Sequence, residues 1–411
     1  MSLKIGLLSY RSHPYSGGQG IYVKHLSKAL AELGHEVDVI SGQPYPELDE
    51  RVNLVKLPSL NIFEEEDRFR SFKMNYLMNP LSLFEWLSVM TGGFPEPYTY
   101  GVRVNRYLKK RLGDYQIIHD NQSLSYALLH IQQNFPLVTT IHHPITRDHK
   151  LELENAKNWK QRLSSNRWHG FLRMQKKVAP SLKAIITPSH SSKIDISNEF
   201  SVNKDFIDVV HNGIDTETFK PNDNKKRIKN RIITTASADV PLKGLKYLIN
   251  ALPKIISLYP DTELVVIGKA KNNGETMKLI KKLNLLPHIH FKSNLKEEDI
   301  VDLYASAELA VIPSLYEGFG FGAGEAMSCG LPLISTLSGG LEDIVKGSCY
   351  EIEPGSSVEI ENAVIDLFDN EEEMKRVALL GRKRILEKFN WRQAAKGYLA
   401  IYEREITRFS S

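Results

Sequence analysis

The chain has 411 residues, more than the roughly 100–200 residues of a typical single domain, so the sequence predicts two domains. Hydrophobic residues make up 42% and charged residues 25%, values that are typical of folded water-soluble proteins and that exclude disordered, fibrous and integral-membrane classes. Lys and Arg number 53 against 49 Asp and Glu, and the resulting charge of +4 is too small for a dedicated nucleic-acid binder. We therefore predict no nucleic-acid partner.

The cysteine content and the N-terminal residues indicate a cytoplasmic protein. Two cysteines, Cys329 and Cys349, are too few for a disulfide framework or a cysteine-rich metal site. The apolar run at residues 5–8 is too short for the hydrophobic region of a secretory signal, and no segment has the composition of a transmembrane helix.

The first half of the chain alternates strand and helix patterns. An apolar strand pattern (4–10) is followed by a loop of small residues (11–20), a periodic helix (21–33) that Gly34 ends, and a second strand (35–41). This βαβ unit predicts a parallel sheet. Further strands are predicted at residues 52–57, 115–119, 137–142, 184–189 and 205–211.

The second half repeats this alternation after a polar stretch. Residues 215–230 have the composition of a linker, and we predict a hinge near residues 212–222. From residue 356 onward the pattern is almost entirely helical. Strands are predicted at residues 231–236, 263–268, 288–292, 308–314 and 331–336.

Two segments of the first half depart from the α/β rhythm. Residues 60–112 contain an acidic run and then a stretch rich in aromatic residues and methionine, and residues 150–183 hold nine Lys or Arg against two acidic residues, with Trp159, Trp168 and Phe171 among them. A basic amphipathic segment can lie on an anionic membrane surface, whereas the simpler interpretation is a solvated helix face at the edge of the domain. Aromatic side chains here would also suit a sugar or a lipid-linked glycan as acceptor.

The most specific local signal is the glycine-rich stretch at residues 313–330. Glu317 and Glu325 are separated by seven residues, and four of these are glycines, at positions 318, 320, 322 and 324. Each glycine in regular structure costs about 0.5–1 kcal/mol, so this density indicates a loop where the backbone approaches a ligand or takes positive φ. The loop joins a strand to a helix, the place where an open α/β sheet binds anions, and a carboxylate there could grip ribose hydroxyls. A tight turn with two solvated glutamates is the alternative.

At this point the sequence resembles the GT-B glycosyltransferases of family 4, a retaining class that uses nucleotide sugars. The stretch EGFGFGAGEAMSCG (317–330) is similar to the family's donor-site motif, and LPLISTLSGGLEDIV (331–345) is similar to the segment that follows it. HNGIDTETFKP (211–221) resembles the interdomain signature, and VPLKGLKYLINAL (240–252) resembles the phosphate-lysine strand and helix. The resemblance covers nearly the whole chain.

The resemblance implies an α/β fold of two Rossmann-like domains with doubly wound parallel sheets, facing across a catalytic cleft. Residues 1–214 would form the acceptor-binding domain, completed by a C-terminal helix at about residues 391–411 that crosses back, and residues 215–390 would bind the nucleotide-sugar donor.

The resemblance also implies roles for residues of the second half. Lys243 would neutralise the donor diphosphate as a compact charge, Glu317 would contact the donor sugar, and Glu325 would bind the ribose. The loop residues Gly318, Phe319 and Gly320 would lie against the phosphates. The family usually has an arginine five or six residues before this lysine, but here these positions are Ala238 and Ser237.

In the first half, Gly17 and Gly18 lie between the first strand and its helix. Val23 stands where a dinucleotide fingerprint would need a glycine, which weakens an NAD-binding interpretation. The resemblance instead implies that the backbone here closes over the donor.

Three histidines and one asparagine complete the predicted site. His119, at the end of a predicted strand, would by resemblance contact the donor sugar as a catalytic residue, with Asn121 as a weaker neighbour, although a histidine in an apolar run is more often a core residue. His142 and His143 end the next strand and would face the acceptor. Two histidines without a carboxylate at ligand spacing do not make a metal site, so we predict neither a metal nor a cofactor.

The sequence thus predicts a retaining glycosyltransferase that moves a hexosyl unit from a nucleoside diphosphate sugar to a hydroxyl acceptor without a metal. Its partners would be the donor, the acceptor and, if the basic segment binds lipid, the inner face of a membrane. Two alternatives stay open: another nucleotide-sugar enzyme on the same scaffold, such as an epimerase or a phosphorylase, and a catalytically silent protein that binds sugar nucleotides or a membrane surface.

Overall fold

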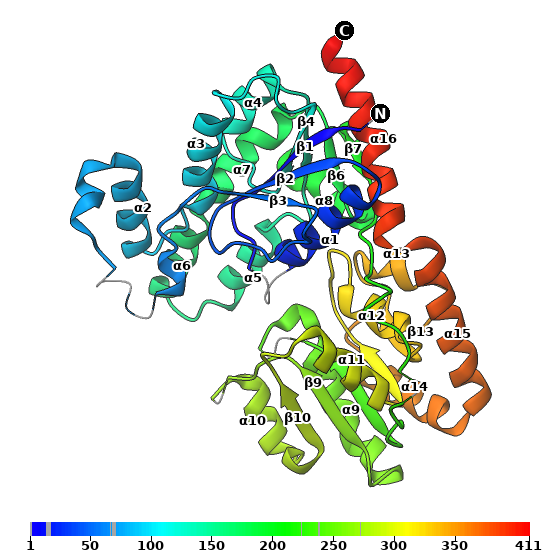
Figure 1. Cartoon of the computed structure of the whole chain (residues 1–411). Coiled ribbons are helices and arrows are strands. Elements are labelled where there is room, and N and C mark those ends of the chain that lie inside the picture. The colour runs from blue at the N-terminus through cyan, green and yellow to red at the C-terminus, as the bar shows by residue number, and fades with distance from the viewer. Residues whose placement is uncertain are drawn as a thin grey trace. The chain divides into compact units, whose positions relative to one another are not determined.

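A computed structural model shows the chain as two compact units (Figure 1). It describes residues 2–13, 18–65, 67, 71–222, 224–236, 239–271 and 273–411. Unit 1 comprises Met1–Pro188, Ser192–Val210 and Ala394–Ser411, and unit 2 comprises Ser189–Ser191 and His211–Gln393. The predicted boundary at residues 214 and 215 is four residues from the passage at Val210 and His211.

Unit 1 is built on a parallel sheet in the order β3-β2-β1-β4-β5-β6-β7. Its central strands are buried on both faces, which is why they appear in the sequence as short continuous apolar runs. The strands are β1 (Lys4–Ser9), β2 (Glu36–Ser41), β3 (Asn53–Lys56), β4 (Ile117–Asn121), β5 (Leu137–Thr140), β6 (Ile185–Thr187) and β7 (Ile207–Val209).

Helices flank this sheet (Figure 1). The α-helices of the first 210 residues are α1 (Gly18–Glu32), α2 (Pro80–Met90), α3 (Glu96–Leu108), α4 (Ala127–Asn134), α5 (Thr146–Asn155), α6 (Trp159–Trp168), α7 (Leu172–Val178) and α8 (His190–Phe200). Short 3-10 turns precede α2, at η1 (Ile62–Glu64) and η2 (Met74–Met78). Helix α2 lies apart from the sheet and, with η2, leaves large apolar side chains exposed, among them Met74, Met78, Phe84 and Leu87.

Unit 2 is built on a second parallel sheet, in the order β10-β9-β8-β11-β12-β13. Successive residues of its strands face two separate cores, because side chains alternate along a strand: Ile232 belongs to one core cluster and Ile233 to the other. The strands are β8 (Arg231–Thr235), β9 (Glu263–Ile267), β10 (Ile289–Lys292), β11 (Leu309–Ile312), β12 (Leu333–Thr336) and β13 (Tyr350–Ile352).

The helices of this half contribute to both of these cores, and the last helix returns the chain to unit 1. They are α9 (Leu245–Leu258), α10 (Glu275–Lys282), α11 (Glu297–Ser306), α12 (Phe321–Ser328), α13 (Leu341–Val345), α14 (Ser357–Asp369), α15 (Glu371–Lys388) and α16 (Trp391–Ser410). The last 18 residues, from Ala394, belong to unit 1. Cys329 and Cys349 are free thiols buried in the core of unit 2.

Two parallel sheets of seven and six strands, with a last helix that joins the first unit, confirm the predicted fold class. The interpretation of residues 215–230 as a linker is wrong for their first part. Phe219 is buried in the core of unit 2, together with Ile214. The polar residues between them form a turn in which the Asp215 carboxylate accepts hydrogen bonds from the backbone of Glu217 and from the backbone and hydroxyl of Thr218.

Candidate active site

The predicted donor residues of unit 2 meet at the carboxyl end of its central strands. Nζ of Lys243 lies 2.6 Å from Oε1 of Glu317, and the hydroxyl of Ser314 donates to the same oxygen at 2.9 Å. The side chains of Lys243 and Glu317 are 32% and 15% exposed, so the lysine stays open to a ligand while the glutamate is largely enclosed. An ammonium group has three N–H donors, and two of those on Lys243 can therefore serve an anion while one holds Glu317.

Local backbone geometry fixes Lys243 in this place. It ends a short 3-10 turn, and Gly244 follows with φ of +64° as the residue directly before α9. A Cβ at Gly244 would lie 1.9 Å from the carbonyl oxygen of Pro313, so only glycine allows the two loops to come this close. Because Pro313 immediately precedes Ser314, this contact brings the lysine turn against the loop that carries Glu317.

The glycine-rich loop ends in a helix N-terminus. Gly320, with φ of +106°, precedes α12, and no described side chain caps this helix end. Within the first turn, the backbone N–H of Ala323 donates to the carbonyl of Gly320. The N–H groups of Phe321 and Gly322 precede it, at the end of the helix where an anion can bind. The loop itself is held from the other side, where the backbone N–H of Gly340 donates to the carbonyl of Glu317 at 2.7 Å.

Glu325 lies one turn inside α12, and its carboxyl group lies beside the hydroxyl of Tyr304. The hydroxyl of Tyr304 lies 3.4 Å from its Oε2 and 2.9 Å from the hydroxyl of Thr235. Burial is the main cause that raises the pKa of Glu325 to about 7, although the Tyr304 hydrogen bond opposes it. At neutral pH this carboxyl group is thus close to its midpoint, and a small change in its surroundings changes its charge.

In unit 1, the structure brings Asn121 and His142 together. Asn121 ends β4, and its Oδ1 lies 2.7 Å from Nε2 of His142, just beyond β5. Burial, followed by repulsion from His143, lowers the pKa of His142 to about 3, so the ring is neutral at physiological pH. His143 is further out, and its Nε2 lies 3.3 Å from Oδ2 of Asp148.

His119 is inside β4, because the strand extends two residues beyond the predicted end at this histidine. Its side chain is fully buried, and both ring nitrogens have partners: Nδ1 lies 2.6 Å from the hydroxyl of Tyr402 on α16, and Nε2 lies 2.7 Å from the hydroxyl of Thr140. Burial is the first cause that lowers its pKa to about 3. A role of His119 in contacting the donor stays a prediction.

Some predicted positions lie outside the described residues. These are Gly17 in the first loop, and Ser237 and Ala238, the positions where the family usually has an arginine. Gly18 is described and begins α1.

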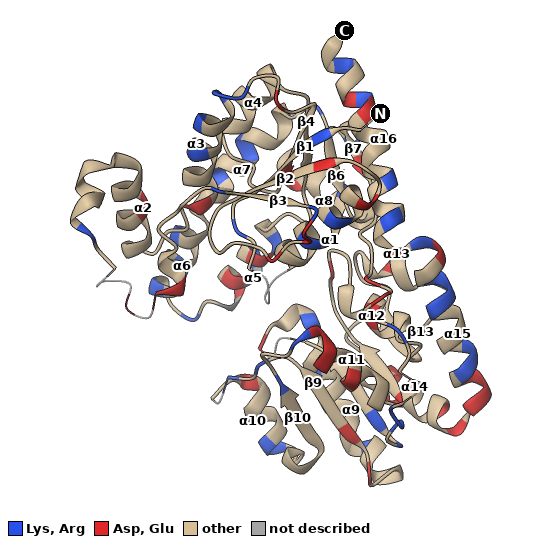
Figure 2. Ribbon diagram, in the orientation of Figure 1, with Lys and Arg blue, Asp and Glu red and all other residues tan. Residues whose placement is uncertain are grey.

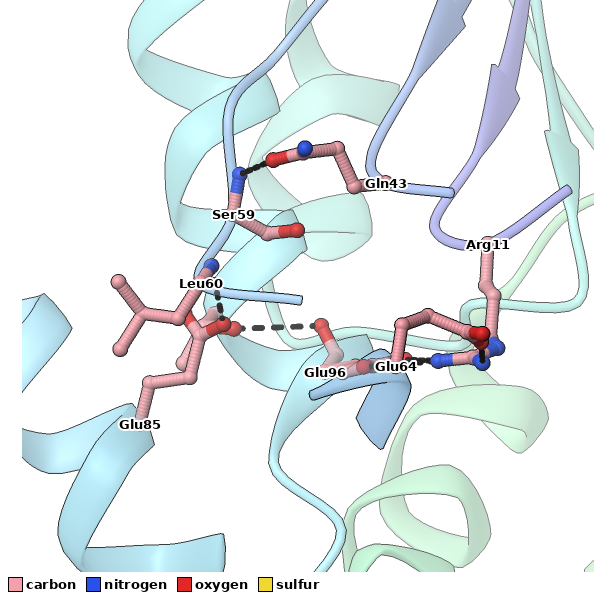
Figure 3. A network of polar contacts seen from close by, with 8 residues as sticks. Arg11, Gln43, Ser59, Leu60, Glu64, Glu85 and Glu96 are labelled. Atoms are coloured by element: carbon pink, nitrogen blue, oxygen red, sulfur yellow. Dashed lines mark hydrogen bonds and ion pairs between the residues drawn. The ribbon is translucent and has the colours of Figure 1, made fainter. Parts of the chain in front are cut away.

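Sequence reasoning missed a charged network near the end of β1 (Figure 3). Arg11 donates to Glu64 at 2.5 Å from Nη2 and to both oxygens of Glu96 at 3.1 and 3.3 Å from Nη1. Burial is the main cause that raises the pKa of Glu96 to about 7, against the attraction of Arg11. Nearby, Glu85 accepts a hydrogen bond from the backbone of Leu60. The arginine directly beyond a strand end was the available sequence signal.

Among the described residues, one group could offer three ligands to a metal ion: His190, His211 and Asp343, whose ligand atoms all lie within 4.8 Å of one another. None of the residues predicted for catalysis belongs to it. The pair His142 and His143 is not part of such a group in the described chain.

The basic segment at residues 150–183 spans most of α5 together with α6 and α7, and its two acidic residues, Glu152 and Glu154, lie on α5. Both signs of charge therefore occur along this segment (Figure 2). No helix in the described part of the chain combines the length and the apolar character needed to cross a bilayer.

Comparison with known proteins identifies relatives over the whole chain. The family model "Glycosyltransferase Family 4" matches residues 16–218, and the model "Glycosyl transferases group 1" matches residues 216–384. The chain is 44% identical to the MMP alpha-(1->4)-mannosyltransferase of Mycolicibacterium hassiacum, over 100% of both chains.

Solved structures share the fold. Sucrose-phosphate synthase from Thermosynechococcus elongatus matches with a TM-score of 0.74 and 20% identity, covering 99% of this chain and 100% of that chain. Anabaena HepE, solved in complex with UDP-glucose, matches with a TM-score of 0.69 and 16% identity, covering 97% and 100%.

Proposed function

Because the chain belongs to the family 4 glycosyltransferases, we propose that it transfers a mannosyl unit, with retention of configuration, from a nucleoside diphosphate sugar to a hydroxyl group of a sugar acceptor. The mannosyl unit is proposed because the 44% identical relative carries that activity in its name. The nucleotide-sugar donor and the retaining outcome rest on the family resemblance and on the chemistry of the site.

The observation that carries the proposal is the pair of Lys243 and Glu317 beside the first turn of α12. Departure of a nucleoside diphosphate leaves negative charge on its terminal phosphate. Lys243 and the first-turn N–H groups of α12 would stabilise this charge where it develops, which lowers the barrier rather than only tightening ground-state binding. Glu317, fixed by Lys243 and Ser314, would accept hydrogen bonds from the hydroxyl groups of the donor sugar.

Glu325 would bind the two hydroxyl groups of the ribose. An ionised carboxylate accepts two hydrogen bonds from neighbouring hydroxyls, and the position of Glu325 in α12 is consistent with the order phosphate, then ribose, along the helix. Retention would follow if the acceptor hydroxyl attacks on the face from which the phosphate departs and passes its proton to that phosphate. Such a route needs no carboxylate pair for double displacement.

In unit 1, Asn121 and His142 would contribute to the acceptor side. Their mutual hydrogen bond holds the neutral ring of His142 in a fixed orientation, which suits contact with uncharged hydroxyl groups better than with phosphate. His143 would lie at the outer edge of this group. His119 supports the same strand end from within, through Thr140 and Tyr402.

We propose that turnover needs no metal and no cofactor. The charge on the leaving diphosphate would be met by Lys243 and by backbone dipoles, which together take the place that a divalent cation has in metal-dependent transfer.

The experiment is a thermal-shift screen against UDP, GDP, ADP and dTDP, followed by transfer assays with mannose and glucose derivatives of the nucleotide that binds. We expect one nucleotide to stabilise the protein and its mannosyl derivative to be turned over with an oligosaccharide acceptor in the presence of EDTA. Binding without turnover with any acceptor would favour a silent sugar-nucleotide-binding protein. Conversion of the donor sugar without an acceptor would favour an epimerase, and loss of turnover in EDTA would refute metal independence.

Peripheral contact with a membrane is a separate proposal. The exposed apolar side chains of η2 and α2, including Met74, Met78 and Leu87, and the lysines and arginines of α6 favour it. Sedimentation with vesicles that contain anionic lipid at low salt tests it, and an unchanged distribution of the protein would refute it.

A further inference from the structure

The two unusual segments of unit 1, residues 60–112 and 150–183, meet in one aromatic cluster. Trp168, at the end of α6, stacks on Phe94 with ring centroids 5.1 Å apart and meets the edge of Phe63 at 5.3 Å. Phe171 contacts Phe94 at 5.5 Å. We call these four residues the aromatic cluster. Side chains from η1, from the loop before α3 and from the end of α6 thus form one surface.

This cluster is only partly covered by protein. Trp168 is 37% exposed, and Phe63 and Phe94 are half-buried. Exposed aromatic surface costs free energy in water in proportion to its area, so a surface that gathers three partly exposed rings favours contact with the apolar face of a ligand.

A polar network borders the aromatic cluster. The guanidinium of Arg11 lies 5.9 Å from the ring centroid of Phe63, and it is held between the carboxylates of Glu64 and Glu96. The side chains of Arg11 and Glu64 are 24% and 42% exposed, so both can be reached from solvent. Fixed N–H donors and carboxylate acceptors therefore lie beside the aromatic rings.

The charge balance of this network indicates the class of ligand. Two carboxylates face the guanidinium of Arg11, so Arg11 offers no surplus positive charge to a phosphate or to an anionic lipid headgroup. The guanidinium of Arg167, the residue before Trp168, donates to the hydroxyls of Ser88 and Thr91. A neutral sugar ring has what the site can use: C–H groups on one face to stack on aromatic rings, and hydroxyls that both accept from arginine and donate to carboxylates.

We propose that the aromatic cluster and Arg11 form a subsite for a sugar residue of the acceptor, a neutral oligosaccharide. Trp168 provides the stacking platform, and Arg11 and Glu64 bind the ring hydroxyls. This inference rests on the proposed function for its catalytic consequence but not for the binding itself. Glu96 is buried and acts as a positioning residue. It accepts hydrogen bonds from Nη1 of Arg11 and so fixes the orientation in which Nη2 lies beside Glu64.

The test compares Trp168→Ala with Trp159→Ala in the full-length protein. Trp159 begins the same helix, is 69% exposed and is not part of the aromatic cluster, so it controls for the loss of an exposed tryptophan. The probes are neutral mannose and glucose oligosaccharides of two to four residues, measured by calorimetry for binding and, with the donor found by the nucleotide screen, by transfer kinetics.

We expect Trp168→Ala to weaken oligosaccharide binding about two- to tenfold and to raise the acceptor KM equally, with the donor KM unchanged, since it removes one aromatic stacking contact. Trp159→Ala should leave both constants unchanged, and Trp168→Phe should recover most of the affinity. Arg11→Lys should also raise the acceptor KM, because lysine keeps the positive charge but lacks the planar guanidinium group, which donates from several nitrogens at once.

Three outcomes would overturn the proposal. In the first, the wild-type protein binds none of the oligosaccharides. In the second, Trp168→Ala and Trp159→Ala have equal acceptor constants. In the third, Trp168→Ala abolishes binding to anionic vesicles but leaves sugar binding intact. Nucleotide stabilisation is measured in parallel on the same variants. A protein that binds oligosaccharide through Trp168 but no nucleotide would refute the proposed function and leave the subsite supported.

Discussion

The hydroxyl of Tyr402 lies 2.6 Å from Nδ1 of His119, although 283 residues separate them in the chain. The histidine lies on β4, the central strand of the sheet of unit 1, and the tyrosine lies on α16. Both side chains are fully buried, so the hydrogen bond is made away from water. The residues that return from the second half of the chain are thereby connected to the centre of the first sheet.

This hydrogen bond should contribute measurably to stability. We expect Tyr402→Phe to lower the free energy of unfolding by about 1–3 kcal/mol, because it leaves a buried ring nitrogen without its partner. Tyr126→Phe removes a hydroxyl from a tyrosine that is 43% exposed and serves as the control. Urea unfolding followed by circular dichroism measures both, and equal midpoints would contradict the assignment.

The buried histidines should make the protein less stable in mild acid. The pKa values of His119 and His142 are lowered to about 3, whereas in the unfolded chain they are near 6.5, so between these values the unfolded state binds more protons. Stability therefore falls as the pH falls from about 6.5 towards 3.

The variant His119→Gln isolates this effect. Carboxyl groups such as Glu96 and Glu325, with raised pKa values of about 7, act in the opposite direction, since the folded state holds their protons up to a higher pH. The contributions of Glu96 and Glu325 are the same in the variant and in wild type. We expect a smaller loss of unfolding free energy between pH 7 and pH 5 in the variant than in wild type. The same loss in both proteins would show that His119 is protonated in the fold.

The close approach of Gly244 to Pro313 should be intolerant of a side chain. Gly244→Ala places a Cβ 1.9 Å from a backbone oxygen and imposes a left-handed φ on alanine, so we expect a loss of about 2–4 kcal/mol and a displaced Lys243. Gly347→Ala is the control, because Gly347 also has positive φ, of +72°, but open space around its Cβ. It should lose only about 1 kcal/mol. Thermal melting and nucleotide binding measure the two effects, and identical behaviour would show that the loop contact is adaptable.

Lys243 should matter to the chemical step more than to folding. Lys243→Ala removes the charge that would meet the departing diphosphate, and we expect kcat to fall about 10²–10³-fold. Lys246→Ala, three residues later on the exposed face of α9, should leave kcat unchanged. Steady-state transfer assays compare them, and similar rates would exclude Lys243 from stabilising the leaving group.

Donor affinity should depend on the ionisation of Glu325. With a pKa of about 7, this carboxyl group gains its charge between pH 6 and pH 8, and the charged form accepts hydrogen bonds from the ribose on both oxygens and more strongly than the neutral form. We expect nucleotide binding to strengthen over this range in wild type and to strengthen less in Glu325→Gln. Both proteins experience the same titration of the nucleotide, so the difference reports the carboxyl group. Parallel calorimetric curves would remove Glu325 from the ribose site.

Strands and helices were predictable where a continuous apolar run or a 3.6-residue period marked them. All ten predicted strands beyond the first βαβ unit overlap observed ones. Strand β13 was missed because its three residues include the exposed Glu351 and form no apolar run. The end of β4 was placed two residues early because Asp120 and Asn121 are polar. Asp120 is nevertheless buried, since it accepts hydrogen bonds from the backbone and hydroxyl of Ser123.

The resemblance named candidate site residues one by one but did not indicate which of them lie in contact. The resemblance pointed to Lys243 and Glu317 separately, and their hydrogen bond joins positions 74 residues apart. The Arg11 network had no comparable motif, because its carboxylates come from η1 and α3, whose approach depends on tertiary packing. The aromatic cluster was not predicted either, because its rings come together only through tertiary packing, although both of its segments were unusual in composition.

Both thiols of the protein lie in unit 2, so their reactivity reports on the opening of that unit alone. Cys329 and Cys349 are enclosed in unit 2, and burial raises the pKa of each to about 12, so neither reacts with an alkylating reagent until that core opens. Unit 1 contains no cysteine. The rate of alkylation therefore measures how often the core of unit 2 opens, independently of unit 1. If unit 2 binds the donor as proposed, this rate should slow when a nucleotide is bound.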